Sequence, residues 1–307
     1  MSRPLSRSIR TMPIRRNALL VLFWMLGSLV SFAGVALSVR GLQHAMTVFE
    51  MLAIRNVGGL VILIGMMVFA PAPDRTLRMV RPGVHLLRNT AHFAGQALWA
   101  WGVTVLPLAM VFAIEFTTPA WVALFAALFL KERMTMARAF AIALGFLGVL
   151  IILRPGLDAF RPEALAVVLS AVFFGIQITA TKLLTGTNST WTLLFWMNLL
   201  QLPMNMAANW AWGHSLWIGG GLGWDVWLPA LGIAVTGFLA HYCLTNAFRH
   251  GDATIVVPID FLRVPLIALI GWMFYAETPE APVLIGALVV IGGVAVSLFA
   301  EGRAKKG

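Results

Sequence analysis

The chain is a succession of long apolar stretches separated by short polar or basic segments. Most of these stretches approach the ~20 residues that an α-helix needs to cross the hydrocarbon core of a bilayer. Their apolar residues follow one another without the strict alternation that marks the strands of outer-membrane barrels. The pattern predicts an all-α polytopic membrane protein. We place ten transmembrane helices at residues 18–39, 48–70, 84–106, 108–130, 137–153, 163–183, 190–212, 226–248, 253–275 and 280–299.

The composition fits a chain whose solvent is lipid. Of the 307 residues, 60% are hydrophobic and only 11% are charged, and the mean hydropathy is +0.88. Charged residues usually make up roughly a quarter of a globular chain. The expected helices and their short loops use nearly the whole sequence, which leaves no room for a separate soluble domain.

The net charge of +10 indicates orientation in a membrane rather than a nucleic-acid partner. The basic residues gather in short clusters between apolar stretches, and most clusters fall on one side of the predicted topology. With ten helices both termini lie on this basic side, so we expect a multi-pass protein of the cytoplasmic (inner) membrane with both termini in the cytoplasm. The basic side includes Arg15, Arg16, Arg75, Arg88, Lys131 and Arg249, and the other side has Arg40, Arg154 and Arg161.

A weak internal repeat divides the chain into two halves. Glu115 and Asp260 are 145 positions apart, as are Glu132 and Glu277. Each half would hold five helices, and an odd number makes the second half enter the bilayer from the opposite face, as inverted repeats of secondary transporters do. The expected organisation is a cytoplasmic tail at 1–17, repeats at 18–155 and 156–300, and a second tail at 301–307.

Few ionisable groups lie inside the predicted helices, and each costs about 2.5–3.5 kcal/mol on insertion scales. Arg55 and Glu115 fall at the same depth, which predicts a charge-assisted pair, and Arg263 lies one helical turn from Asp260. The functional interpretation is a central cavity for a polar or zwitterionic solute, and the structural one is buried pairs that fix helix register. The candidate residues for binding or coupling are Arg55, Glu115, Asp260, Arg263, Asn198, Gln96, His92 and His241.

Prolines interrupt the two predicted helices that carry carboxylates. Each proline removes a backbone donor and frees a carbonyl, which is tolerated at membrane depth where the backbone is buried or lines a wet cavity. Two glutamates lie at the ends of the same helices. The candidates for a gating or structural role are Pro119, Glu132, Pro258, Pro265 and Glu277.

Several segments resemble the drug/metabolite transporter superfamily, in particular proteins with two EamA domains. They are Pro107 to Pro119, Leu130-Lys131-Glu132-Arg133, Gly145 to Val149, Asn246 to Thr254, Pro258 to Arg263, and Glu277. The resemblance covers essentially the whole chain. It implies transport of a small polar or zwitterionic metabolite, such as an amino-acid-like compound, a vitamin or a metallophore, with protons as a candidate coupling ion and a homodimer left open. Distant four-helix relatives use a carboxylate in their first helix, and the first stretch here has none.

Other classes fit the sequence less well. A membrane enzyme needs a nucleophile with a base, or metal ligands, at suitable spacing; the sequence has one cysteine, Cys243, and no HExxH motif or phosphate-binding glycine loop. We therefore predict no catalytic residue, metal or cofactor. Without an ATP-binding domain, transport would use an ion or solute gradient or be passive. A flippase for a lipid or lipid carrier stays open as the alternative within transport.

Overall fold

The computed structural model describes residues 18–69, 77–129, 136–154, 161–185, 187–214, 223–250, 259–260 and 262–304. Every regular element in these ranges is helical, which confirms the predicted all-α class for the described part of the chain. The helices are α1 (Ala18–Leu42), α2 (Val48–Phe69), α3 (Pro82–Val105), α4 (Leu108–Glu115), α5 (Thr118–Phe129), α6 (Met136–Leu153), α7 (Ala164–Thr185), α8 (Thr190–Ala211), α9 (Trp224–His250), α11 (Arg263–Tyr275) and α12 (Ala281–Ala304).

The helices fall on the apolar stretches, with one clear difference. The stretch 108–130 was expected as one helix, but it forms two, α4 and α5, which are interrupted at Phe116 and Thr117. The helix α11 begins only at Arg263, and the preceding residues 253–258 lie outside the described ranges. The break between α4 and α5 and the start of α11 at Arg263 therefore both fall inside stretches that were predicted as single helices.

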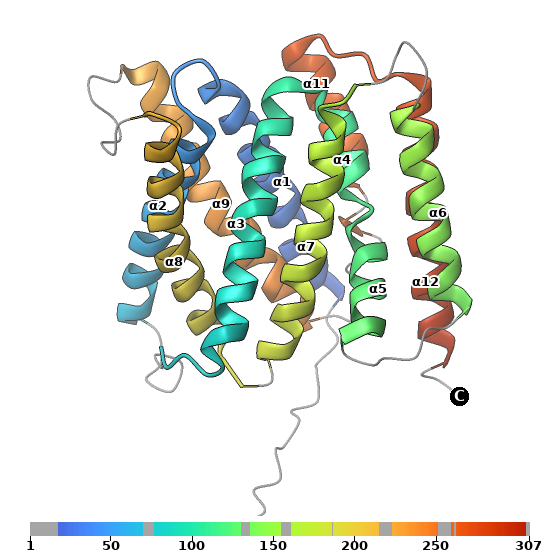
Figure 1. The fold of residues 1–307 in the computed structure, drawn as a ribbon, viewed down its shortest axis with the longest axis horizontal. Helices are drawn as coiled ribbons and strands as arrows, with labels where there is room; N and C mark the ends of the chain where they lie inside the picture. Colours follow the sequence, from blue (N-terminus) through green and yellow to red (C-terminus); the bar gives the residue numbers. More distant parts are fainter. Residues whose placement is uncertain are drawn as a thin grey trace, which may run out of the picture.

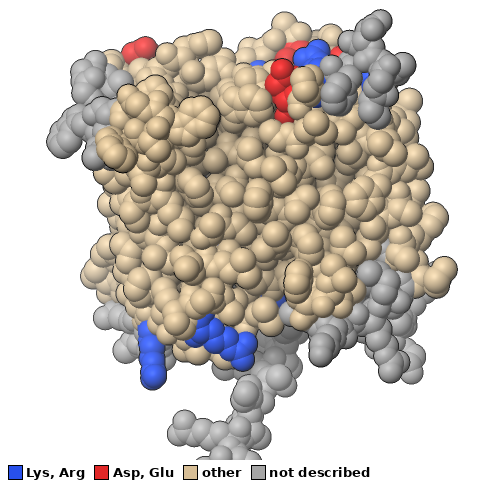
Figure 2. Space-filling view, in the orientation of Figure 1, with Lys and Arg blue, Asp and Glu red and all other residues tan. Residues whose placement is uncertain are grey.

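The outer surface identifies an integral membrane protein. Among the described residues, five helical segments are long and apolar enough to cross a membrane, and they are Leu19–Leu42, Val48–Phe69, Leu108–Phe129, Ala164–Leu184 and Trp224–Leu244. Large apolar side chains such as Leu19, Phe129 and Leu228 point outward. On the face drawn in Figure 2 the middle of the molecule carries no visible Lys, Arg, Asp or Glu, and these residues appear at its two ends. A water-soluble protein rarely exposes so large an apolar surface.

The helices pack in pairs that are distant in sequence (Figure 1). The helix α1 lies along α9, α3 along α7, α2 along α8, and α6 along α12, while α4 contacts α11. Small residues allow the closest of these approaches. A Cβ at Gly148 would lie 2.8 Å from the carbonyl oxygen of Gly286, and a Cβ at Gly286 would lie 2.7 Å from that of Gly148. Such contacts favour helix association in lipid, where apolar burial adds little.

The bundle has two distinct ends. The helices α1, α3 and α8 begin at the end where α12 finishes, which is the lower edge of Figure 1. We call it the C-terminal end. The turn between α1 and α2 and the segment after α11 lie at the opposite end.

Candidate functional site

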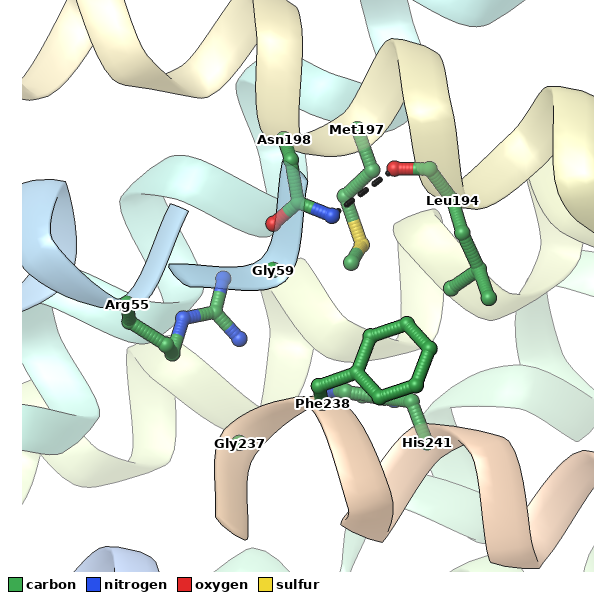
Figure 3. A pocket seen from close by; sticks show the side chains of 8 residues that line it. All are labelled: Arg55, Gly59, Leu194, Met197, Asn198, Gly237, Phe238 and His241. Atoms are coloured by element: carbon green, nitrogen blue, oxygen red, sulfur yellow. Dashed lines mark hydrogen bonds between the residues drawn. The ribbon is translucent and has the colours of Figure 1, made fainter. Parts of the chain in front are cut away.

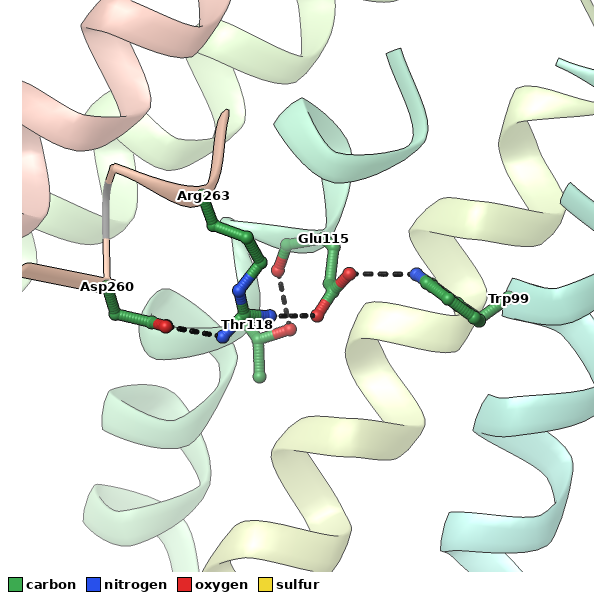
Figure 4. Close-up of polar contacts among 5 residues, drawn as sticks. All are labelled: Trp99, Glu115, Thr118, Asp260 and Arg263. Atoms are coloured by element: carbon green, nitrogen blue, oxygen red, sulfur yellow. Dashed lines mark hydrogen bonds and ion pairs between the residues drawn. The ribbon is translucent and has the colours of Figure 1, made fainter. Parts of the chain in front are cut away.

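Two carboxylates share one arginine in the interior of the bundle (Figure 4). The Nη2 atom of Arg263 donates to both oxygens of Asp260, at 2.6 and 2.7 Å, and Nη1 donates to Oε1 of Glu115 at 3.1 Å. The other oxygen of Glu115 accepts a hydrogen bond from Nε1 of Trp99 at 2.8 Å. We call Glu115, Asp260 and Arg263 the carboxylate cluster. It joins α3, α4 and the start of α11.

The helix interruptions position this cluster. Pro119 has no N–H to donate to the carbonyl four residues earlier, which belongs to Glu115. The hydroxyl of Thr118 donates to that carbonyl instead, at 2.7 Å, and the hydroxyl of Thr117 donates to the carbonyl of Ile114, also at 2.7 Å. The chain can therefore break inside the bundle without leaving these carbonyls unpaired, and the break aims the side chain of Glu115 at Arg263.

The two interruptions stand at corresponding positions in the two halves of the chain. In the first half α4 ends at Glu115 and α5 starts at Thr118; in the second half Asp260 precedes α11, which starts at Arg263. Each pair is separated by the same 145 positions as the predicted repeat. The ion cluster thus lies where α4 ends and α11 begins.

A small cavity lies between α2, α8 and α9 (Figure 3). The space that its side chains leave free is only about 10 Å³. Its walls combine apolar side chains with the polar groups of an arginine, an asparagine and a histidine, and they are Arg55, Gly59, Leu194, Met197, Asn198, Gly237, Phe238 and His241. Space of about 10–15 Å³ on this scale holds a single water molecule, so binding of a metabolite requires the bundle to open.

The expected pair between Arg55 and Glu115 is wrong. Glu115 pairs with Arg263, whereas Nη2 of Arg55 points to the side-chain oxygens of Asn56, at 3.2 Å, and Gln201, at 3.5 Å. Equal depth in the bilayer fixes the height of a side chain but not the direction in which its helix faces. The predicted proximity of Asp260 and Arg263 is confirmed.

A row of polar side chains, all buried except the half-buried Asn188, extends from the cavity toward the C-terminal end of the bundle. Gln201 Nε2 lies 2.8 Å from Nδ1 of His92 and 3.5 Å from the backbone oxygen of Asn89, and Arg88 Nη1 donates to the side chain of Asn89 at 2.9 Å. Below them, Nε2 of His85 lies 3.3 Å from the side-chain oxygen of Asn188. We call this row the polar column; its members are Arg55, Asn56, His85, Arg88, Asn89, His92, Asn188 and Gln201.

Aromatic contacts connect the polar column to the carboxylate cluster. The rings of His92 and His241 have centroids 5.7 Å apart, and the ring of Phe32 lies 5.9 Å from that of His241. The guanidinium carbon of Arg263 stands 3.9 Å above the same Phe32 ring, a cation–π distance. The predicted residues Arg55, His92, His241 and Arg263 therefore belong to one continuous interior surface.

The predicted polar residues Asn198 and Gln96 also lie in the interior. Asn198 lies at the cavity, and its amide donates to the carbonyl of Leu194 at 2.9 Å. Gln96 is half-buried on α3, between His92 and Trp99. Three further residues do not enter this description: Glu132 and Pro258 lie outside the described residues, and only the backbone of Pro265, within α11, is described.

Glu277 takes part in a second ion pair, at the end opposite the C-terminal end. Its Oε1 accepts a hydrogen bond from Nη1 of Arg40 at 2.6 Å, and its Oε2 accepts one from the backbone N–H of Leu108 at 2.8 Å. Arg40 also donates to the carbonyls of Val103 and Leu106, both at 2.6 Å. This contact joins α1, the turn between α3 and α4, and the segment that follows α11.

Sequence reasoning missed two groups of residues at the site. Arg88 was counted with the cytoplasmic basic residues because it lies near the start of its helix, yet it is buried and bonded to Thr181, on α7, at 2.8 Å. Gln201 was not singled out, although Gln96, a residue of the same type, was. A signal for both exists: polar residues recur at three- and four-residue spacing on α3 and α8, which places them on one face of each helix.

An apolar bundle that encloses ionic groups and a polar cavity defines a membrane protein that accepts polar solutes in its interior. The family is identified by its sequence. The chain belongs to the EamA-like transporter family, whose sequence model matches residues 19–154 and again residues 161–299. It is thus a transporter with two EamA-like segments, of the drug/metabolite type that the resemblance indicated.

The curated relatives are transporters of small metabolites. The riboflavin transporter of Rhizobium johnstonii is 35% identical over 223 residues, which cover 73% of this chain and 71% of that protein. The S-adenosylmethionine uptake transporter of Rickettsia bellii is 28% identical and covers 92% of this chain and 94% of its own length. The pseudopaline exporter of Pseudomonas aeruginosa is 29% identical and covers 67% and 70%. These relatives favour neither the lipid flippase nor the membrane enzyme.

A solved crystal structure shares the fold. It superposes with a TM-score of 0.64 at 19% sequence identity and covers 92% of this chain and 98% of that chain. Family and relatives therefore agree that this protein is a small-metabolite transporter of the membrane.

Proposed function

We propose that the protein is a secondary transporter that carries a small polar or zwitterionic metabolite across the cytoplasmic membrane by alternating access. The observation that carries this proposal is the cavity at Arg55, Asn198 and His241, which lies inside a bundle with an apolar exterior. Ionisable groups inside a membrane protein usually mark a solute or ion pathway. The transported solute would pass between the polar column and the carboxylate cluster.

The proposed architecture has ten transmembrane helices in two inverted repeats, at 18–155 and 156–300, with short tails at 1–17 and 301–307. Its support is the pattern of helix pairs. The first helix of one half packs on the third helix of the other, as α1 on α9, and the same holds with the halves exchanged, as α7 on α3. The second helices, α2 and α8, pack on each other, and so do the last, α6 and α12. An axis in the membrane plane relates such pairs.

We place both termini in the cytoplasm, so that the pair between Arg40 and Glu277 is on the external side. Fusion of reporters that are active on one side only, at Gly220 and Gly307, tests this orientation. Signals on opposite sides are expected. Signals on the same side would rule out ten helices and the inverted repeat.

The contact between Arg40 and Glu277 fits an external gate. It ties α1 to the start of α4 and to the segment after α11, and these elements must separate for the cavity to open in that direction. Glu132 occupies the position in the first half that Glu277 occupies in the second, and we assign it the role of a gate at the cytoplasmic side. A homodimer stays a prediction.

Protons are the proposed coupling ion, with Asp260 as the first candidate carrier and Glu115 as the second. Both carboxylates compete for Arg263, and protonation of one would release its share of that contact. The release would loosen the junction between α4 and α11.

Transport is tested with purified protein in liposomes. Riboflavin and S-adenosylmethionine are the first solutes, because relatives with these named substrates cover most of the chain. We expect saturable movement of at least one, faster with an imposed proton gradient, and its loss in Glu115→Gln. Leu228→Ala, on the lipid-facing surface, is the control. Movement no faster than in empty liposomes for a broad metabolite panel would contradict the proposal.

A further inference from the structure

Two arginines of the polar column are buried to the same extent but differ in their contacts. Arg55 and Arg88 are each 4% exposed, and neither forms an ion pair with an Asp or Glu in the described part of the chain. Arg88 donates from all three guanidinium nitrogens, to Thr181, to Asn89 and Leu193, and to the sulfur of Met197. Its hydrogen-bonding capacity is largely used by neutral groups of the protein.

Arg55 is poorly satisfied in comparison. Both of its contacts come from Nη2, at 3.2 and 3.5 Å, near or beyond the upper end of the usual N–H···O range. Its Nε is buried and has no hydrogen-bond partner among the described residues. A buried guanidinium without an anion destabilises the fold. An anion from outside the protein would compensate the charge of Arg55.

The cavity is where that partner would bind. Arg55 lines it, and Figure 3 shows the guanidinium directed at the space between α8 and α9. Gly237 provides the room, since a Cβ there would lie 2.8 Å from Cγ of Arg55. The opposite walls, formed by Leu194, Met197 and Phe238, are apolar and therefore strengthen an ionic contact made inside.

We propose that Arg55 binds an anionic group of the transported solute, a carboxylate or a phosphate, through its guanidinium in this cavity. This inference rests on the proposed function and specifies its substrate class. The guanidinium of an arginine can donate two parallel N–H bonds to either a carboxylate or a phosphate. The rest of the solute would lie against Phe238 and Met197, beside Asn198.

Two pairs of compounds that differ by one anionic group provide the test. S-adenosylmethionine is compared with its decarboxylated form, and riboflavin 5′-phosphate with riboflavin, by calorimetric titration of the purified protein in nanodiscs. The first pair reports on a carboxylate and the second on a phosphate. We expect the acid of at least one pair to bind about 10- to 100-fold more tightly than its partner, the range for hydrogen bonds to a charged group. Arg55→Gln should remove this preference.

Arg88→Met is the matched control, because it removes an equally buried guanidinium. Without ligand, Arg55→Met should raise the midpoint of thermal unfolding by about 2–4 °C, since it removes a buried charge that no anion compensates. Arg88→Met should lower the midpoint, since Thr181 and Asn89 lose their donor. An equal fall in both variants would identify Arg55 as a structural tie and overturn the proposal.

The remaining outcomes separate this site from transport itself. If solutes cross the membrane but the wild-type protein binds both members of each pair equally, or Arg55→Gln keeps the preference, the anion site is wrong and the transporter stands. If acids bind more tightly in an Arg55-dependent way while no solute crosses, the anion site stands and the transport proposal fails.

Discussion

The carboxylate cluster and the polar column differ in how the charge of their buried arginines is compensated. In the cluster one guanidinium meets two carboxylates, and the backbone breaks on either side of the contact. In the column two guanidinium groups, of Arg55 and Arg88, meet only neutral groups among the described residues. The cluster pairs its guanidinium with two carboxylates and ties the end of α4 to the start of α11. The column carries excess positive charge, which suits it to receive a solute.

This difference has a physical basis in where each region lies. The cluster occupies the junction of α4 and α11, where interrupted helices expose backbone groups and need strong side-chain contacts. The column runs between α2, α3 and α8, which are continuous helices. Its side chains are therefore not needed to hold the ends of interrupted helices. A contact through Phe32 and His241 joins the two regions, and binding in one is therefore positioned to affect the other.

The largest effect is expected from Arg263→Met. Removal of this arginine leaves Glu115 and Asp260 without their shared cation, and breaking a buried pair in this way costs about 3–5 kcal/mol. The yield of monodisperse protein from size-exclusion chromatography should fall severely. Combining Arg263→Met with Glu115→Gln and Asp260→Asn should restore much of the yield. A single variant with wild-type yield would show that the cluster does not hold the broken helices together.

Asp260→Asn is expected to act on coupling more than on folding. The change removes a carboxylate that bonds to Arg263 through both oxygens, a contact to a charged group worth about 1.5–3 kcal/mol. Glu115 remains to hold Arg263, so folded protein should persist at a reduced level. If Asp260 carries the coupling proton, transport per folded molecule should lose its dependence on pH between about pH 5.5 and 8, within the range where folded proteins are usually most stable, while solute exchange continues.

The groups around Asp260 define the controls for that experiment. Arg263 contacts it directly, Glu115 lies on the other side of the same guanidinium, and His241 lies beyond Phe32. Glu115→Gln and His241→Gln are therefore measured in parallel. An unchanged pH profile in Asp260→Asn alone would transfer the coupling role to Glu115, and an altered profile in His241→Gln would assign it to the histidine.

Much of the fold was readable from the sequence, because each helix had to be apolar and about as long as the bilayer is thick. The interior was readable only in part. Asp260 and Arg263 are close in sequence, so their contact followed from one helical turn. The partner of Glu115 depends on how α4 and α11 rotate against each other, which neither depth nor periodicity of a single helix determines.

The unpredicted parts have local causes as well. The break between α4 and α5 needed more than Pro119, since Thr117 and Thr118 must supply the hydrogen bonds that make it tolerable. Arg88 lies close enough to a helix end that its side chain was expected to reach water, a common behaviour of long basic side chains. Packing of α3 against α7 and α8 encloses it instead.

Gly237→Ala tests the polar column without changing any charge. The added Cβ would meet Cγ and Cδ of Arg55 at 2.8 and 2.9 Å, so the guanidinium must shift, at a cost of about 1–3 kcal/mol for overpacking. We expect weaker binding of the acid in each compound pair and little change in its neutral partner. Gly65→Ala is the control on the same helix as Arg55, because nothing lies within 4 Å of its added Cβ. Equal loss for both members would indicate general distortion.

Thr118→Val is expected to have the smallest effect, and it separates the two regions most cleanly. Valine has nearly the shape of threonine but leaves the carbonyl of Glu115 without its side-chain donor, which Pro119 cannot replace. The loss should destabilise the protein by about 1 kcal/mol and should reduce transport, because the side chain of Glu115 would shift.

Thr104→Val is the control. The hydroxyl of Thr104 donates to the carbonyl of Trp101 at 2.7 Å, but the N–H of Val105 remains as a donor to that carbonyl, so this substitution should destabilise the protein less. Since the polar column does not touch Thr118, the preference of the cavity for acids should be unchanged in Thr118→Val. If calorimetric titration instead shows a reduced preference for acids in Thr118→Val, the carboxylate cluster and the polar column form one site and are not separate regions.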